Sequence, residues 1–146
     1  MNDVKSLYNL WVEKTKNNLE IQEFMIVPKK ETFKESLRCA SEIFHELKTL
    51  LEKEGLTTSV GDEGGFAPVL KNNKVALGYI VKAIEISGYT PGKDVFIALD
   101  IAASTFYNEN KKTYKIEDKI LTNEELLEYY MELLQNYPII SIEDPF

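Results

Sequence analysis

The sequence is poor in the residues that build thiolate and histidine sites. Cys39 is the only cysteine and His45 the only histidine among 146 residues. A single cysteine excludes an internal disulfide and a thiolate metal cluster. Both residues lie in one stretch of helical periodicity, and neither forms with its neighbours a motif of nucleophile, base or metal ligands. We therefore assign no chemistry to either.

Long apolar runs and basic stripes are also absent. No apolar run approaches the length of a membrane span, and the first residues, MNDVKSLYNLWVEK, carry charge where a signal peptide has an apolar stretch, so we expect a cytoplasmic protein. The net charge of −7 argues against nucleic acid or an acidic membrane as a partner, because no basic stripe is present to replace phosphate counterions. The composition of the chain, 44% hydrophobic and 28% charged residues, is typical of one folded globular domain.

A glycine-rich stretch, Thr57 to Pro68 (TTSVGDEGGFAP), interrupts this ordinary composition. Its glycines allow positive φ and close approach of backbone N–H groups to a ligand, which is typical of a tight loop at a strand's end. Asp62 and Glu63 lie between these glycines, where the loop can aim both carboxylates at a site. A lone glycine-rich loop is a weak signal, so a surface turn with solvated carboxylates remains the alternative on this pattern alone.

Four other stretches have the spacing of amphipathic helices. They are Asn2 to Asn18, Thr32 to Gly55, Lys71 to Ser87 and Thr122 to Asn136. Thr32 with Glu35 predicts a capping box, and Gly55 is a typical C-terminal stop. The polar segment from Phe106 to Ile116 predicts a hairpin or another polar excursion.

Three apolar runs are expected to form strands, and each carries a carboxylate. They are Ile21 to Val27, Val95 to Asp100 and Ile139 to Glu143. The run VFIALD is almost continuously apolar up to its last residue, Asp100, as in a parallel strand covered on both faces. Glu23 lies inside the first run, where an ionised carboxylate is costly unless it has a partner.

Because strands and helices alternate, we expect a parallel sheet whose strands end on one side. Asp100 and Glu143 should then converge with the loop that holds Asp62 and Glu63. A hard cation such as Mg²⁺ would relieve the repulsion between these carboxylates. The alternative is that each acid caps the helix that follows its strand.

Four motifs occur in a particular order and approximate spacing. Together they identify a family more specifically than any single motif does. They are NNLEIQEFMIVP (17–28), TTSVGDEGGFAP (57–68), VFIALDIAASTFY (95–107) and YPIISIEDPF (137–146). In these motifs the chain resembles the enolase (phosphopyruvate hydratase) family from about Asn17 to its last residue. The resemblance implies an α/β fold, a partial (β/α) TIM-type barrel of the enolase C-terminal domain with about four strands alternating with helices. It divides the chain into a divergent N-terminal segment, residues 1–16, and a partial barrel domain, residues 17–146.

The resemblance also implies a reaction and a set of site residues. Enolases dehydrate 2-phosphoglycerate to phosphoenolpyruvate in glycolysis, with Mg²⁺ and a lysine base. By resemblance, Glu63 matches the acid that protonates the departing hydroxyl, Glu23 a second glutamate at the substrate, and Gln22 a substrate-contacting position. Asp100 and Glu143 match two of the three carboxylates that hold Mg²⁺. The third carboxylate and the lysine base are expected beyond the last residue of this chain.

Two functions for this chain follow from the resemblance. The first is an enolase-type lyase, with 2-phosphoglycerate and phosphoenolpyruvate as ligands and a homodimer as the full-length assembly; the isolated chain, without the lysine, is expected to be inactive. The alternative is a catalytically inactive, enolase-derived fragment that acts as an assembly or interaction module, with a second chain completing the barrel at its open edge. A Mg²⁺-dependent phosphate-binding α/β domain of another kind is a more distant alternative. Thr105 and Val69 depart from the family pattern, where a glutamate and an asparagine are expected.

Overall fold

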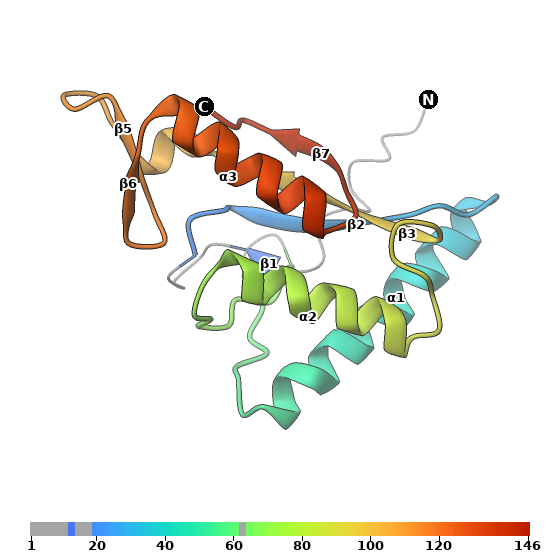
Figure 1. Ribbon diagram of the computed structural model, residues 1–146. Helices are drawn as coiled ribbons and strands as arrows, with labels where there is room; N and C mark the ends of the chain where they lie inside the picture. The colour runs from blue at the N-terminus through green and yellow to red at the C-terminus, as the bar shows by residue number, and fades with distance from the viewer. Residues whose placement is uncertain (1–11, 14–18, 62–63) are drawn as a thin grey trace.

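The structure, a computed structural model, describes residues 12–13, 19–61 and 64–146. The helices are α1 (Phe33–Lys53), α2 (Asn73–Ile86), α3 (Asn123–Asn136) and the short 3₁₀ helix η2 (Ala103–Phe106). The strands are β1 (Val12–Glu13), β2 (Glu23–Pro28), β3 (Val95–Asp100), β4 (Tyr107–Asn108), β5 (Thr113–Ile116), β6 (Lys119–Leu121) and β7 (Ile139–Glu143). Figure 1 shows that the described elements form an open α/β arrangement, which confirms the partial barrel that the sequence predicts.

Most of the helix expected over Asn2–Asn18 lies outside the described residues. Val12 and Glu13 are described, and they form β1, which pairs antiparallel with β2 at Phe24 and Glu23. The helix prediction is wrong at these two residues, because pairing at the edge of a sheet overrides a weak local periodicity.

The main sheet is mixed rather than parallel. Its strand order is β1-β2-β3-β7, with β2 antiparallel to β3 and β3 parallel to β7. The prediction of an all-parallel sheet is wrong because two helices, α1 and α2, lie between β2 and β3. One helix returns the chain to the start of a parallel strand, whereas a pair of helices returns it to the other end, so the next strand runs in the opposite direction.

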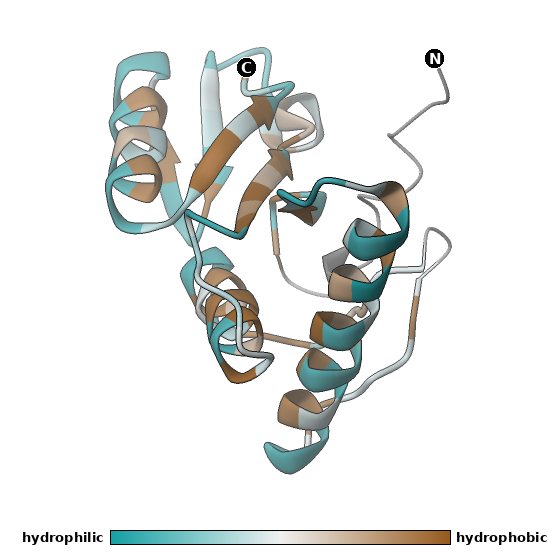
Figure 2. Cartoon of the chain, turned by 90° about the vertical axis from the view of Figure 1, so that its right-hand side faces the viewer, coloured by the Kyte–Doolittle hydropathy of each residue, from teal (hydrophilic) through white to brown (hydrophobic). Residues whose placement is uncertain are grey.

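One face of β3 is buried and the other is half-exposed. Val95, Ile97 and Leu99 have no exposed surface, while the residues that alternate with them are partly exposed. The prediction that this strand is covered on both faces is therefore wrong, because a continuous apolar run does not specify what covers the second face. Figure 2 shows the hydrophobic residues along the strands and in stripes on the helices. The largest fully buried side chains of the core are Phe24, Ile26, Ile43, Leu47, Leu51, Phe66, Leu77, Ile80 and Ile84, together with Leu19 and Ile21.

The helix boundaries follow the local signals in the sequence. The Thr32 side chain accepts a hydrogen bond from the Glu35 N–H at 3.2 Å, and Gly55 ends α1 in the left-handed region at φ +71°. Thr122 and Glu125 form the reciprocal capping box of α3. Each of these contacts satisfies backbone groups that have no partner inside the helix. None of the described helices combines the length and the apolar character needed to cross a membrane.

A second, three-stranded antiparallel sheet has the order β4-β5-β6. The predicted hairpin is confirmed in β4 and β5, but β6 was not predicted. Glu117 and Asp118 join β5 to β6 with φ of 46° and 62°, the two positive values that a type I′ hairpin turn requires. The signal is weak because this turn lacks the usual Asn-Gly or Asp-Gly pair.

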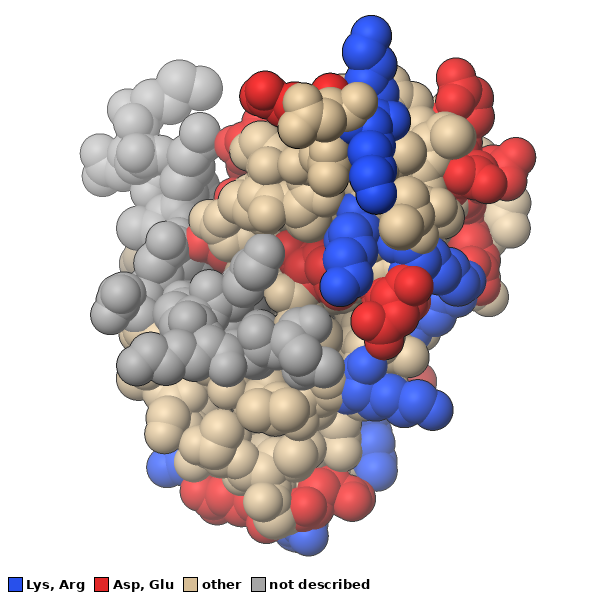
Figure 3. Space-filling view, turned by 90° about the vertical axis from the view of Figure 1, so that its left-hand side faces the viewer, with Lys and Arg blue, Asp and Glu red and all other residues tan. Residues whose placement is uncertain are grey.

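Figure 3 shows the surface of the side that lies at the left in Figure 1. Basic side chains form a band there that is bordered by acidic side chains, so both signs of charge meet on this surface.

Candidate metal and substrate site

Carboxylates from three strands stand in one row of the main sheet. Glu23, the first residue of β2, is the register partner of Asp100 at the end of β3. Asp100 is in turn the register partner of Glu143 at the end of β7. Register partners on neighbouring strands lie about 4.5–5.5 Å apart at Cα and turn their side chains to the same face. The antiparallel direction of β2 is what brings the start of that strand into this row.

An irregularity in β7 determines the face on which Glu143 lies. The register between β3 and β7 shifts beside Ile97, and Ile140 is the extra residue in β7. Ile139 and Glu143 are four residues apart and would share a face in a regular strand. They pair, however, with Ile97 and Asp100, which are three residues apart and lie on opposite faces. The extra residue therefore leaves Ile139 on the buried face and turns Glu143 to the side of Asp100, as β-bulges near functional sites do.

Backbone hydrogen bonds hold the row on both sides of β3. The Gln22 N–H donates to the Asp100 carbonyl at 3.0 Å, and the Ile101 N–H donates to the Glu143 carbonyl at 3.0 Å. The Asp100 carboxylate accepts at Oδ1 from the N–H of Ala102 at 3.1 Å, and Ala102 has a left-handed φ of 48°. The tight turn after β3 thus orients the carboxylate of Asp100.

The row becomes more exposed from one end to the other. Glu23 is only 8% exposed, Asp100 is half-buried and Glu143 is exposed. Ionised carboxylates side by side repel one another, most strongly where water is excluded. A divalent cation is the usual way to remove that repulsion in a protein.

The two predicted metal ligands fit Mg²⁺ in chemical type, because Mg²⁺ prefers hard oxygen ligands. Asp100 and Glu143 supply such oxygens from adjacent positions. In the described part of the chain, however, no three acidic, histidine or cysteine side chains converge on a common point as metal ligands. The described residues therefore fit part of a magnesium site.

The glycine-rich loop is anchored close to its ends. Glu63 and Asp62 lie outside the described residues, so their predicted convergence with the row is not placed. Around them, the Gly61 N–H donates to the Gly65 carbonyl at 2.9 Å, and Val60 forms a β-bridge with Phe66. Phe66 is buried and stacks on Phe44 with ring centroids 4.4 Å apart. Backbone pairing between the described residues on either side closes the loop, but an isolated β-bridge stands where the sequence predicted the end of a strand.

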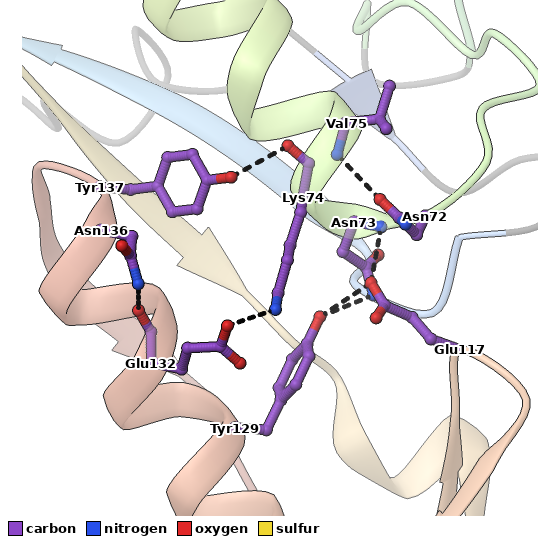
Figure 4. A network of polar contacts seen from close by, with 9 residues as sticks. All are labelled: Asn72, Asn73, Lys74, Val75, Glu117, Tyr129, Glu132, Asn136 and Tyr137. Atoms are coloured by element: carbon purple, nitrogen blue, oxygen red, sulfur yellow. Dashed lines mark hydrogen bonds and ion pairs between the residues drawn. The ribbon is translucent and has the colours of Figure 1, made fainter.

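A buried polar network near the row was not predicted from the sequence (Figure 4). Asn73 is fully buried, and its side-chain amide donates to Glu20 Oε2 at 3.2 Å and to the Tyr129 hydroxyl at 3.3 Å. Tyr129 donates to Glu117 Oε1 at 3.1 Å, and the Asn73 N–H donates to the same oxygen at 2.9 Å. Burial, followed by the charge of Glu117, raises the pKa of Tyr129. The sequence signal for Asn73 was only that of a residue at a helix start.

This network supports the strand that carries the buried end of the row. Glu20 lies two residues before Gln22, and its Oε1 accepts from the Glu117 N–H at 3.1 Å. Through these contacts the approach to β2, the start of α2, the β5–β6 turn and α3 are joined. The half-buried Gln22 then follows directly, next to Glu23.

Cys39 and His45 take no part in this site. Cys39 is fully buried in α1, and burial raises the pKa of its thiol, which keeps it in the unreactive protonated form. His45 lies on the exposed side of the same helix, where its ring contacts Phe44 edge-on.

The fold and the site together define a class, an open α/β sheet with acids at the end of its parallel strands. Comparison with known proteins gives the family. The family described as "Enolase, C-terminal TIM barrel domain" matches residues 11–146. The enolase of Natranaerobius thermophilus is 54% identical over 133 residues, which are 90% of this chain and 31% of that protein. The chain belongs to the enolase C-terminal barrel domain family, and it spans about a third of the length of this curated relative.

Proposed function

We propose that this chain carries part of the active site of an enolase-type lyase, which dehydrates 2-phosphoglycerate to phosphoenolpyruvate with Mg²⁺. The observation that carries the proposal is the row of Glu23, Asp100 and Glu143 across three neighbouring strands. We place the reaction in glycolysis and in the cytoplasm, with a homodimer as the full-length assembly, because the family implies these properties.

In this proposal Asp100 and Glu143 hold Mg²⁺. When bound, the ion would supply positive charge that favours loss of the proton next to the substrate carboxylate. The N–H of Ala102 orients the Asp100 carboxylate, and the bulge at Ile140 turns Glu143 to the same face. Both features set the ligand geometry before the ion arrives, which reduces the reorganisation that binding requires.

Glu23 and Gln22 contact the substrate next to the metal ligands. A buried carboxylate such as Glu23 holds or transfers a proton in a setting with little water, which strengthens its interaction with the substrate. Glu63 on the glycine-rich loop donates a proton to the departing hydroxide, which leaves as water, while the base keeps the proton taken from carbon. Exchange of one proton with solvent at each group then restores both, so the net loss is one water. The lysine that takes the carbon proton is assigned by family resemblance to a segment beyond residue 146.

The proposal is tested in a chimera. The matched 133 residues of the Natranaerobius thermophilus enolase are replaced by the corresponding residues of this chain. Phosphoenolpyruvate formation is then followed by its ultraviolet absorbance. We expect an active enzyme, and Glu23→Gln, Glu63→Gln and Asp100→Asn each to lower kcat by about 10²–10⁴-fold.

Glu109→Gln is the matched control, since it makes the same chemical change at an exposed position in the loop between β4 and β5. Its activity should equal that of the unmodified chimera. A well-folded chimera without activity, or one that is equally active with Asp100→Asn and with Glu109→Gln, would contradict the proposal.

A further inference from the structure

The segment that leads into β2 is held by a carboxylate that is bound at both of its oxygens. Glu20 Oε1 accepts a hydrogen bond from the Glu117 N–H at 3.1 Å, and Glu20 Oε2 accepts one from the side-chain amide of Asn73 at 3.2 Å. The same amide also donates to the Tyr129 hydroxyl at 3.3 Å. Two donors on one carboxylate fix its orientation as well as its position. Glu20 is therefore tied both to the start of α2 and to the β5–β6 turn.

These contacts lie just before the point where the pairing of β2 with β3 begins. The first register pair is Glu23 with Asp100, and the Gln22 N–H donates to the Asp100 carbonyl at 3.0 Å. The backbone bends at Glu20 and Ile21, ahead of this register. The last pair of a strand ladder opens more readily than the pairs inside it, because nothing beyond it holds the strands together. A side-chain contact just outside the ladder therefore limits opening at Gln22 and Glu23.

The link between Glu20 and Gln22 is short and well packed. Ile21 is the single residue between them and is fully buried, and Leu19, on the other side of Glu20, is 2% exposed. A close-packed core leaves such side chains little room to move independently. A displacement of Glu20 is therefore transmitted to Gln22 and, one residue further along, to Glu23.

The chemistry of the side-chain amide explains why an asparagine suits position 73. Figure 4 shows Asn73, Glu117 and Tyr129 turned toward one another from three different elements. Asn73 donates its backbone N–H to Glu117 and its side-chain amide to Glu20. An aspartate would lose the amide hydrogens and place a third negative charge beside these two carboxylates. An asparagine supplies the donors without a charge of its own, which a side chain with no exposed surface requires.

We propose that Asn73 and Glu20 are positioning residues for the start of β2. They keep the side chains of Gln22 and Glu23 beside Asp100, and they act through the strand rather than on the substrate. This inference rests on the proposed function, in which Gln22 and Glu23 contact the substrate. The rival interpretation is that the network only stabilises the fold. In that case any equally destabilising change in the core would have the same effect on the site.

Amide hydrogen exchange on the full 146-residue chain, read by NMR, tests the positioning directly. Asn73→Asp turns the donor into a carboxylate that faces Glu20, and it should speed exchange of the Gln22 amide by about tenfold or more. The reference is the Lys29 amide, which donates to the Asp94 carbonyl at 2.7 Å at the other end of the same strand pair and should be unaffected. Equal acceleration of both amides, or no acceleration at Gln22, would overturn the proposal.

Ile84→Ala is the matched control for a purely structural effect. Ile84 has no exposed surface and lies near the other end of α2, so its truncation lowers stability from the same helix without touching the network. It should not speed exchange of the Gln22 amide relative to that of Lys29. Urea denaturation measures the stability that each variant loses, and circular dichroism checks that each is folded.

The chimera described above reports the effect on the reaction. Asn73→Asp should lower kcat/KM by about 10–100-fold, because a misplaced substrate contact slows a reaction whose chemistry is intact. Ile84→Ala should leave kcat/KM close to that of the unmodified chimera. Adding Glu20→Gln to Asn73→Asp should restore most of the loss. The introduced amide at position 20 then donates to the introduced carboxylate at position 73, so donor and acceptor are exchanged across the same contact.

Glu20→Gln alone is the milder variant, because it turns one of two acceptors into a donor at a half-buried position. It should show the same selective changes to a smaller degree, so the test does not depend on the folding of Asn73→Asp. A folded Asn73→Asp chimera with unchanged kcat/KM, or one that Glu20→Gln fails to rescue, would overturn the positioning role. A folded chimera without any activity contradicts the proposed function alone. Exchange of the Gln22 amide in the isolated chain then still decides whether Asn73 holds the start of β2.

Discussion

β2 and β7 flank the same strand, carry a glutamate in the same row, and differ in what surrounds them. β2 is buried along most of its length and its Glu23 is 8% exposed, whereas β7 is largely exposed, including Glu143. Both come from short apolar runs with a carboxylate, IQEFMIV and IISIE. The difference shows that the sequence predicts that a strand forms and where its carboxylate lies along it. The elements packed around the strand decide how far it is buried.

The largest expected effect compares one substitution in the two strands. Ile26→Ala in β2 removes a fully buried side chain and should lower the free energy of unfolding by about 2–5 kcal/mol. Ile140→Ala in β7 removes a side chain that is 55% exposed and should change it by no more than about 0.5 kcal/mol. Urea denaturation of both variants measures the difference. Equal losses would mean that β7 is covered as fully as β2.

The next effect tests the support behind β2. Asn73→Ala removes the amide that donates to Glu20 and Tyr129, and it leaves a partly buried carboxylate with one donor fewer. We expect a loss of about 2–3 kcal/mol in the free energy of unfolding. Asn110→Ala, at an exposed position in the β4–β5 loop, is the control and should be neutral. An equally small effect of both variants would show that the network does not stabilise β2.

The same network predicts a dependence on alkaline pH. Because the pKa of Tyr129 is raised in the folded chain, the unfolded chain loses this proton first, above pH of about 10. Stability is therefore unaffected by this group below that pH and falls above it, by at most about 1.4 kcal/mol per pH unit. Denaturation of wild type and Tyr129→Phe from neutral to alkaline pH gives the difference. Parallel pH profiles for the two proteins would show that Tyr129 is not held protonated.

The smallest effect concerns the exposed end of the row. Asp100 and Glu143 supply two carboxylates, so Mg²⁺ should bind the isolated chain weakly and, at a concentration near its Kd, stabilise it by about 0.4 kcal/mol. Glu143→Gln should remove most of this shift in melting temperature, whereas Glu109→Gln should keep it. Tight stoichiometric binding of Mg²⁺ to the isolated chain in calorimetry would contradict the prediction that this chain supplies only part of the metal site.

Local signals predicted much of this fold because the groups involved are close in sequence. Thr32, Thr122 and Gly55 mark helix ends through contacts within a few residues, and β7 begins and ends where the apolar run does. The row itself was predicted in part, from the carboxylates at the ends of Val95–Asp100 and Ile139–Glu143.

The features that were missed depend on contacts between distant residues. The two helices between β2 and β3 were both predicted, but the pairing of β2 with β3, which shows that the two strands run in opposite directions, joins distant residues. The bulge at Ile140 is visible only once β7 is paired with β3. Asn73 meets Glu20 and Tyr129 across 53 and 56 residues, and no local pattern indicates such partners.

Amide hydrogen exchange, read residue by residue by NMR on the isolated chain, tests the contrast between β2 and β7 most directly. We expect slow exchange along β2 and β3, and fast exchange for the amides of β7 that turn away from β3, at low and at high protein concentration. Protection of β7 equal to that of β2 at both concentrations would contradict it, because β7 would then have a neighbour on both sides.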